Sequence, residues 1–205
     1  MFSNIEWLFF DIGSTIIDER LAYQHRLQEL AECANVSYQE VQTQALSFYR
    51  QNEKGDSKTA KLYSVPVPKW HPEDEILFPD AVECLKTLSR TYKMGIFANQ
   101  SPGTQNRLRE HGILEYFSLI IASAEEGVSK PDPRIFELAL AKSGCSPNHG
   151  IMIGDRIDND IVPANLLGMH TIWIKQGFGQ YWQIARDVEQ ADYVVSSLGE
   201  LCEIL

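Results

Sequence analysis

Short apolar runs alternate with longer amphipathic segments along most of this chain. Six short runs are rich in β-branched and aromatic side chains, as buried strands are: residues 5–10, 94–98, 119–122, 151–153, 171–174 and 193–195. The segments between them, such as 79–92 and 132–144, carry apolar residues at helical spacing. This alternation predicts an α/β fold, with a doubly wound parallel sheet covered by helices on both faces.

Residues 18–71 interrupt the alternation. They contain no good strand candidate, and three stretches of them have helical character: residues 18–36, 37–54 and 55–63. The proline-rich segment 64–80 then has the composition of a linker that returns to the sheet. We therefore expect two domains, a sheet core formed by residues 1–17 and 72–205 and a small helical domain formed by residues 18–71.

The charge of the chain limits the partners that it can bind. The 205 residues carry a formal net charge of -10. Such an acidic chain lacks the electrostatic footprint of a protein that binds nucleic acid or an anionic membrane surface. If the protein binds an anion, nearby cationic side chains or a metal ion must provide the positive charge.

The four cysteines lie far apart, with no CxxC spacing: Cys33, Cys84, Cys145 and Cys202. This pattern indicates neither a zinc site nor a disulfide framework, and reduced thiols fit the cytoplasm. The N-terminus has acidic residues in place of a basic region, and no apolar run approaches the roughly 18 residues of a membrane span. We therefore expect a cytoplasmic protein, and its oligomeric state stays open.

Polar side chains follow four of the predicted strands, at the edge where an open α/β sheet collects its ligands. The first strand ends at Asp11 and the second at residues 99–101, the third leads towards Lys130, and the fourth ends in "GDRIDND" at residues 154–160. Carboxylates, a lysine and small polar residues are therefore expected to converge at one place.

These residue types suit a cation and a phosphate. Mg²⁺ prefers an octahedral set of oxygens, usually carboxylates, waters and a substrate phosphate. Asp11 and Asp155 could meet around such an ion, with Asp158 and Asp160 orienting its waters or completing its shell. Lys130 can supply a fixed positive charge to phosphoryl oxygens and to the Asp11 carboxylate.

As an ordered set, these motifs resemble those of the haloacid dehalogenase superfamily, most of whose members are Mg²⁺-dependent phosphatases. The resemblance rests on "DIGST" at residues 11–15, "IFANQS" at residues 96–101, Lys130 and "GDRIDND" at residues 154–160. The helical insertion resembles the type 1 cap of that family. The resemblance covers nearly the whole chain and implies a Rossmann-like core with a small cap domain.

The resemblance also implies residue roles. Asp11 would be the nucleophile that attacks phosphorus, giving an aspartyl-phosphate that water then hydrolyses. Lys130 would hold Asp11 and the phosphate, and Asn99 with neighbouring backbone amides would cradle phosphate oxygens. Asp11, Asp155 and the backbone carbonyl of Gly13 would bind Mg²⁺, with Asp160 supporting the metal shell.

Position 13 departs from the family pattern. Phosphatases of the family usually carry a second Asp there, which protonates the leaving oxygen and then activates water, whereas this chain has Gly13. General acid–base help is worth about 10²- to 10⁴-fold in rate, or roughly 3 to 5 kcal/mol of barrier. We therefore expect Gly13→Asp to raise turnover of esters with poor leaving groups more than that of p-nitrophenyl phosphate.

A second departure lies at Ala98, where the family usually has Ser or Thr, so Ser101 or Ser14 would have to supply the hydroxyl to the phosphate. Other side chains could replace the missing acid at position 13. The candidates are Asp18, Glu19, His25, Lys58, Lys61 and His71.

The leading hypothesis is therefore a Mg²⁺-dependent hydrolase that removes phosphate from a small phosphorylated metabolite. A second hypothesis is an impaired member of the fold that binds a phosphorylated ligand or a protein partner. A third is a haloacid dehalogenase, a branch that also lacks the second Asp but needs no metal. The intact acidic cluster at residues 154–160 favours a cation and hence the first hypothesis.

Overall fold

The computed structural model describes residue 2 and residues 4–205. Its centre is a six-stranded sheet in the order β5-β4-β1-β6-β7-β8, and every neighbouring pair is parallel. The strands are β1 (Trp7–Phe10), β4 (Lys93–Ala98), β5 (Leu119–Ala122), β6 (Gly150–Gly154), β7 (His170–Ile174) and β8 (Tyr193–Val195). The predicted α/β fold is thereby confirmed, and each predicted strand is present.

Helices follow the strands in the order that the apolar spacing predicts. They are α4 (Ala81–Leu88), α5 (Thr104–Glu110), α6 (Ser123–Glu126), α7 (Pro133–Ser143), α8 (Val162–Leu166) and α9 (Leu198–Ile204). Shorter helical turns complete the connections: η1 (Pro72–Asp74), η2 (Leu114–Tyr116), η3 (Pro147–His149), η4 (Ile157–Ile161), η5 (Gly177–Tyr181) and η6 (Asp187–Glu189). Helix α7 begins as expected, because the Asp132 side chain accepts a hydrogen bond from the Arg134 N–H and Pro133 occupies the first turn.

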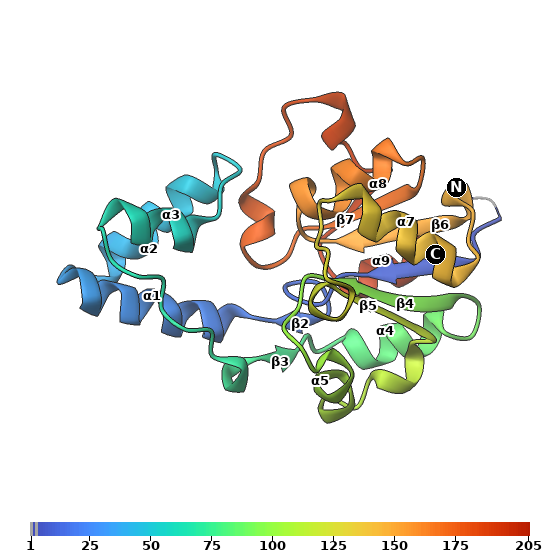
Figure 1. Cartoon of the computed structure of the whole chain (residues 1–205), viewed down its shortest axis with the longest axis horizontal. Helices are drawn as coiled ribbons and strands as arrows, with labels where there is room; N and C mark the ends of the chain where they lie inside the picture. Colours follow the sequence, from blue (N-terminus) through green and yellow to red (C-terminus); the bar gives the residue numbers. More distant parts are fainter. Residues whose placement is uncertain (1, 3) are drawn as a thin grey trace.

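Strand β1 lies in the middle of the sheet and is buried on both faces. Side chains alternate between the faces of a strand, so Leu8 and Phe10 join one hydrophobic cluster with residues of α4, α5 and α9. Trp7 and Phe9 join the opposite cluster, with residues of α7 and α8. The two clusters make a helix–sheet–helix sandwich with β1 at its centre (Figure 1). The residue that follows β1 is therefore placed by a rigid support.

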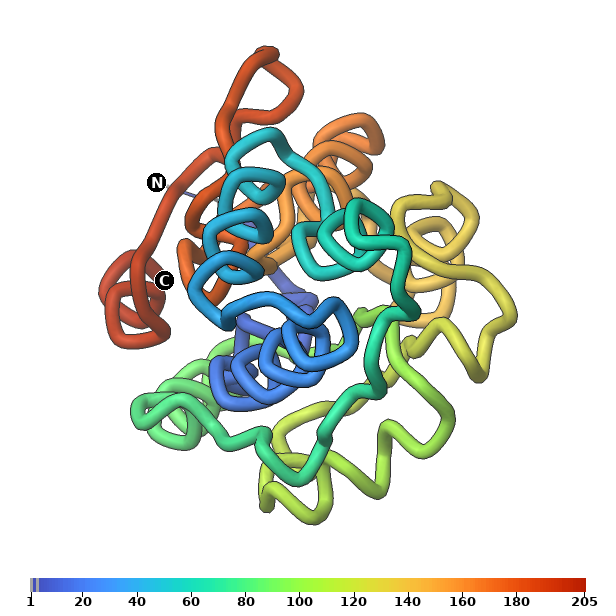
Figure 2. The backbone as a smooth tube through the Cα atoms, turned by 90° about the vertical axis from the view of Figure 1, so that its left-hand side faces the viewer, coloured from blue at the N-terminus to red at the C-terminus, as the bar shows by residue number. Residues whose placement is uncertain are grey.

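Three helices form a separate group beside the sheet: α1 (Arg20–Ala34), α2 (Tyr38–Tyr49) and α3 (Gly55–Leu62). They bury their own apolar cluster, which includes Leu30 of α1, Ala45 of α2 and Ala60 of α3. Figure 2 shows them in front of the sheet when the molecule is seen from their side. Phe178 of η5 stacks on Tyr49 with ring centroids 4.3 Å apart, which joins this group to the loop after β7.

A two-stranded antiparallel ribbon marks where the chain leaves and re-enters the sheet region. It pairs β2 (Ile17–Asp18) with β3 (Ile76–Leu77). These strands were absent from the sequence-based expectation, because two residues are too few to show a period of two. The ribbon places the start of α1 next to the end of the linker that follows α3.

Two further features concern the whole of the described chain. All four cysteines are free thiols. None of the described helices combines the length and the apolar character that crossing a bilayer requires.

Replacing Phe136 by Ala tests the α7 side of the core. The Phe136 side chain is fully buried and meets the Phe97 ring edge-on, with centroids 4.5 Å apart. We expect Phe136→Ala to lower the free energy of unfolding by about 3–5 kcal/mol, measured by urea denaturation. Leu166→Ala on α8 is the control, because Leu166 is 73% exposed and its loss should cost less than about 0.5 kcal/mol. Equal effects of the two changes would contradict this packing.

Candidate active site

Asp11 stands at the carboxyl edge of the sheet because β1 ends directly before it. Phe10 is in register with Ile96 of β4 and Ile153 of β6, and the Asp11 N–H donates to the Ile153 carbonyl at 2.9 Å. The backbone of Asp11 is thus held by the sheet while its side chain leaves it. This edge is where an open parallel sheet presents its ligand-binding residues.

Lys130 brings a buried positive charge to Asp11. Its Nζ donates to Asp11 Oδ1 at 2.7 Å, to Asp160 Oδ1 at 2.6 Å and to the Phe97 carbonyl at 2.8 Å. Burial by itself lowers the pKa of Lys130, but the carboxylates of Asp11 and Asp160 outweigh that effect and raise the pKa. The ammonium group is therefore charged at neutral pH and uses all three of its N–H donors.

Asn99 fixes the backbone of Lys130. Its Nδ2 donates to the Lys130 carbonyl at 2.8 Å, and its Oδ1 accepts from the Lys130 N–H at 2.8 Å. The sequence motif suggested a phosphate contact for Asn99, and the structure adds this positioning contact. One N–H of the Asn99 amide stays free for a phosphate oxygen.

Three carboxylates meet beside Lys130. Oxygens of Asp11, Asp155 and Asp160 all lie within 4.8 Å of one another. Burial, together with the charges of the other two, raises the pKa of Asp155 well above its usual range. Burial also raises the pKa of Asp160 to about 6, although Lys130 opposes that shift. The cluster is thus short of positive charge.

A divalent cation fits this deficit. Both oxygens of Asp160 are occupied, one by Lys130 Nζ and the other by the Arg156 N–H at 3.0 Å. By contrast, no group in the described part of the chain donates a hydrogen bond to the Asp155 carboxylate, although Asp155 is buried. A buried carboxylate without a donor is costly unless a cation pairs with it. The all-oxygen donor set suits Mg²⁺.

Asp158 lies apart from this cluster. Its carboxylate accepts from the Arg156 guanidinium, with Nε 2.9 Å from Oδ1. The expectation that Asp158 orients metal-bound waters therefore has no support in the geometry, since its charge is already paired.

Glu19 occupies the space beside Gly13. A Cβ atom added to Gly13 would lie 2.4 Å from Glu19 Oε1 and 2.8 Å from Glu19 Oε2. Ser14 Oγ donates to Glu19 Oε2 at 3.0 Å. Burial, with a smaller contribution from the Asp11 charge, raises the pKa of Glu19 from the usual 4.5 to about 8. An acidic group thus stands where the glycine has no side chain.

This arrangement revises the expectation for Gly13→Asp. An aspartate at position 13 would meet the Glu19 carboxyl group, so the substitution displaces one acid while adding another. The rate enhancement expected from the sequence therefore requires that Glu19 be shortened at the same time.

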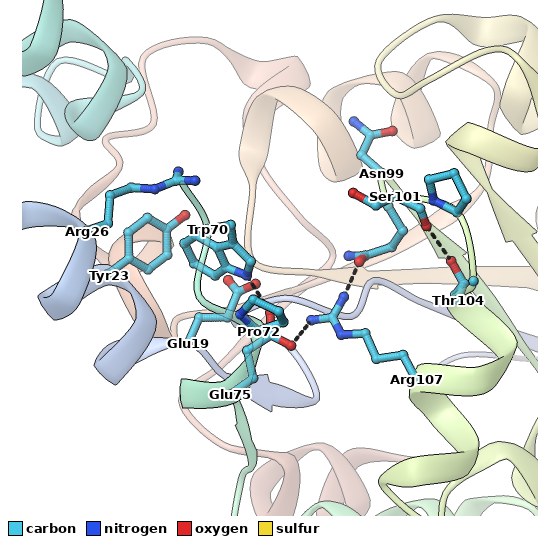
Figure 3. A pocket seen from close by; sticks show the side chains of 13 residues that line it. Glu19, Tyr23, Arg26, Trp70, Pro72, Glu75, Asn99, Ser101, Thr104 and Arg107 are labelled. Atoms are coloured by element: carbon cyan, nitrogen blue, oxygen red, sulfur yellow. Dashed lines mark hydrogen bonds and ion pairs between the residues drawn. The ribbon is translucent and has the colours of Figure 1, made fainter. Parts of the chain in front are cut away.

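A cavity of about 540 Å³ adjoins Glu19. Figure 3 shows Tyr23 and Arg26 of α1 and Trp70 of the linker on one side of it, and Asn99, Ser101 and Thr104 on the other. Tyr23 and Arg26 also border a second cavity that reaches Ser14 and Asp155. The site predicted at the sheet edge is thus covered by helix α1.

The sequence did not single out several residues that line the larger cavity. They are Tyr23, Arg26, Trp70, Glu75 and Arg107. No local pattern marks them, because they come from α1, the linker and α5 and meet through the tertiary fold.

The remaining candidates for the missing acid lie elsewhere. His25 and His71 stack on each other with ring centroids 3.6 Å apart, and Lys58 pairs with Glu53. Lys61 is exposed. None of these four lines either cavity.

Comparisons with known proteins show which proteins this chain is similar to. Residues 5–168 match the family model described as haloacid dehalogenase-like hydrolase. A glyceraldehyde 3-phosphate phosphatase of Pyrococcus furiosus is 28% identical, over 98% of this chain and 93% of that protein. A phosphoserine phosphatase of Thermus thermophilus is 34% identical, over 49% of this chain and 41% of that protein. The solved structure of a HAD phosphatase from Thermococcus onnurineus superposes with a TM-score of 0.66 at 25% identity, covering 98% of this chain and 97% of that one.

Mg²⁺ should stabilise the protein through Asp155. A saturating ligand adds RT ln(1 + [L]/Kd), about 2.7 kcal/mol at 100 times Kd, so the melting temperature should rise when Mg²⁺ replaces EDTA. Asp155→Asn should raise stability in EDTA, because it removes a buried and poorly compensated charge, and should lose most of the Mg²⁺ effect. Asp158→Asn is the control and should keep that effect. A full Mg²⁺ shift in Asp155→Asn would contradict this assignment.

Glu19 should make stability depend on pH. Its pKa is about 8 in the folded protein against 4.5 ordinarily, so the folded state binds the proton more tightly. Stability from this group is therefore lost as pH rises from about 4.5 to about 8. In EDTA, Glu19→Gln should gain stability relative to wild type across that window, measured by urea denaturation below and above it. If the difference in unfolding free energy between Glu19→Gln and wild type does not change with pH, the burial of this carboxyl group is contradicted.

Proposed function

This chain belongs to the haloacid dehalogenase-like hydrolase family, and on that premise we propose that it is a phosphatase of a small phosphorylated metabolite. The observation that carries the proposal is the contact of Lys130 Nζ with both Asp11 and Asp160, at the edge of the sheet where Asp155 completes a cluster of carboxylates. A nucleophile, a fixed cation and a site for a divalent ion are the parts that phosphoryl transfer requires.

Asp11 is the proposed nucleophile. One of its oxygens is held by Lys130, which leaves the other to attack phosphorus. The phosphoryl group is then carried on Asp11 as an acyl phosphate, and water releases it as inorganic phosphate. Lys130 holds Asp11 in place and offsets the charge of the incoming phosphate.

Phosphate oxygens need hydrogen-bond donors at the same place. The free N–H of Asn99 and the hydroxyl of Ser101 are proposed for this role, since both residues line the larger cavity. Ala98 is buried and has no hydroxyl to offer.

Mg²⁺ is the proposed cofactor. Asp11, Asp155 and the carbonyl of Gly13 would hold it, and Asp160 would support it through Lys130 and the Arg156 N–H. The ion would neutralise charge on the phosphoryl oxygens.

Residues 18–71 are proposed to act as a cap over a core of residues 1–17 and 72–205. Tyr23, Arg26 and Trp70 from this segment face the core residues Asn99 and Ser101 across the cavity. Closure over a bound substrate would exclude water from the reaction. The substrate stays undefined, because the similar phosphatases are named for different metabolites. Free thiols and the acidic charge suit the cytoplasm as its location.

Two other functions fit the fold less well. A protein that merely bound a phosphorylated ligand would not need Asp11 and Lys130 in contact. A haloacid dehalogenase would not need the further carboxylates of Asp155 and Asp160.

The phosphatase proposal is tested by screening phosphate esters with Mg²⁺. Asp11→Asn removes the nucleophile and should lower kcat/KM by roughly 10³-fold or more, measured as release of inorganic phosphate. Asp132→Asn is the control, since the half-buried Asp132 caps α7 and pairs with Arg134. If wild type turns over no ester above the Asp11→Asn background, the proposal fails. Calorimetric binding of phosphate without turnover would then favour the binding protein.

A further inference from the structure

The proposed reaction lacks an obvious proton donor. When the P–O bond of a phosphate ester breaks, an alkoxide leaves poorly unless an acid protonates it. Gly13, two residues after Asp11, has no side chain to donate a proton. Another titratable group must therefore approach the leaving oxygen.

Few of the residues that line the cavity can supply this proton. Arg26 and Arg107 are permanently charged. Glu75 is engaged, because it accepts from Trp70 Nε1 at 2.6 Å and forms an ion pair with Arg107. Glu19 is the carboxyl group that borders the cavity without a cationic partner.

The loop after β1 carries Glu19 back to Gly13. The N–H groups of Ile16 and Ile17 both donate to the Ile12 carbonyl, and the Ser14 N–H donates to the Ile17 carbonyl at 2.8 Å. This tight turn sets position 17 beside position 13. The two residues of β2 then place residue 19 within reach of the space above Gly13.

The space above Gly13 is filled by the Glu19 carboxyl group. Both of its oxygens lie within 2.8 Å of the point where a Cβ of residue 13 would be. The hydroxyl of Ser14 holds Oε2 at 3.0 Å, so Oε1 is free of that contact. A glycine is needed at position 13 because any side chain there would push this carboxyl group away.

The neighbouring acid is oriented differently. The Asp18 carboxylate accepts from the Arg20 N–H at 2.8 Å and lines a different cavity, beside Arg20 and Phe78. The two adjacent acidic side chains thus have different contacts. The Asp18 carboxylate accepts from the N–H of Arg20, whereas the Glu19 carboxyl group lies beside Gly13.

We propose that Glu19 is the general acid and base of the phosphatase reaction, acting from the space beside Gly13. The inference rests on the proposed function and adds a catalytic residue to it. Glu19 also precedes α1, and its backbone carbonyl closes the first turn of that helix by accepting from the Tyr23 N–H at 2.9 Å. The proton donor is therefore carried by the segment that covers the site.

Both chemical steps balance with this assignment. In the first, an Asp11 oxygen bonds to phosphorus, the P–O bond to the leaving group breaks, and the leaving oxygen takes its electron pair and the proton of Glu19. In the second, the Glu19 carboxylate takes a proton from water as the water oxygen bonds to phosphorus. The bond from phosphorus to Asp11 then breaks, and both carboxyl groups return to their starting states.

The test is the dependence of the rate on the leaving group. Glu19→Gln keeps the size of the side chain but cannot donate an acidic proton. It should lower kcat/KM for an alkyl phosphate by about 10²- to 10⁴-fold and that for p-nitrophenyl phosphate far less, because p-nitrophenolate leaves without protonation. With p-nitrophenyl phosphate, the variant should also release a burst of p-nitrophenol, since hydrolysis of the phosphorylated Asp11 loses its base.

A double variant tests whether a carboxyl group in the space beside Gly13 is sufficient, whichever residue carries it. Gly13→Asp with Glu19→Ala moves a carboxyl group into the same space from the other side, and it should recover at least a tenth of the wild-type rate with the alkyl ester. Glu19→Ala alone should not. Asp18→Asn is the matched control, and it should keep the wild-type ratio of the two rates.

The outcomes separate the two proposals. An equal loss with both esters in Glu19→Gln, or no loss, would overturn the role of Glu19 while leaving the phosphatase intact. Failure of the double variant to exceed Glu19→Ala, with thermal unfolding showing that both are folded, would also count against it. A wild-type protein without turnover of any ester would overturn both proposals together.

Discussion

The buried ammonium group of Lys130 is the interaction on which the candidate site depends. It connects the end of β1, the end of β4 and the segment after β6, through Asp11, the Phe97 carbonyl and Asp160. A buried lysine without carboxylate partners would tend to lose its proton. Buried carboxylates without the lysine would likewise be left as unpaired and costly charges. The arrangement is therefore stable as a set, and Asn99 keeps it in register by holding the Lys130 backbone at both its N–H and its carbonyl.

The balance of charge around that ammonium group is incomplete. Asp155 adds a further buried carboxylate that no donor in the described chain reaches, and a divalent cation would fit beside it. Burial raises the pKa of Glu19, whose carboxyl group is held by the neutral hydroxyl of Ser14. The two groups differ in their contacts, because Lys130 reaches the Asp11 carboxylate and the Ser14 hydroxyl reaches that of Glu19.

The glycine at position 13 and the position of the Glu19 carboxyl group depend on each other. In a chain with a side chain there, Glu19 could not lie where it does, because its carboxyl oxygens occupy that volume. The loss of a side chain and the inward turn of Glu19 are thus two parts of one arrangement. Residues of α1 and the linker line the cavity, whereas the carboxylates and Lys130 lie at the edge of the sheet. The similarity to phosphatases named for different substrates fits such a separation between the cavity and the carboxylate cluster.

The sequence by itself determined the sheet and the main carboxylates. Runs such as 94–98 and 151–153 were recognised within one residue of their observed ends, since both faces of a central parallel strand are buried and its apolar run is continuous. Asp11 and Asp155 could be predicted to meet, because parallel strands end at one edge. The tertiary structure alone decided where Glu19 turns, which of Asp158 and Asp160 joins Lys130, and which residues line the cavity. Those choices depend on backbone hydrogen bonds of a tight loop and on contacts between distant segments, and neither leaves a periodic pattern along the chain.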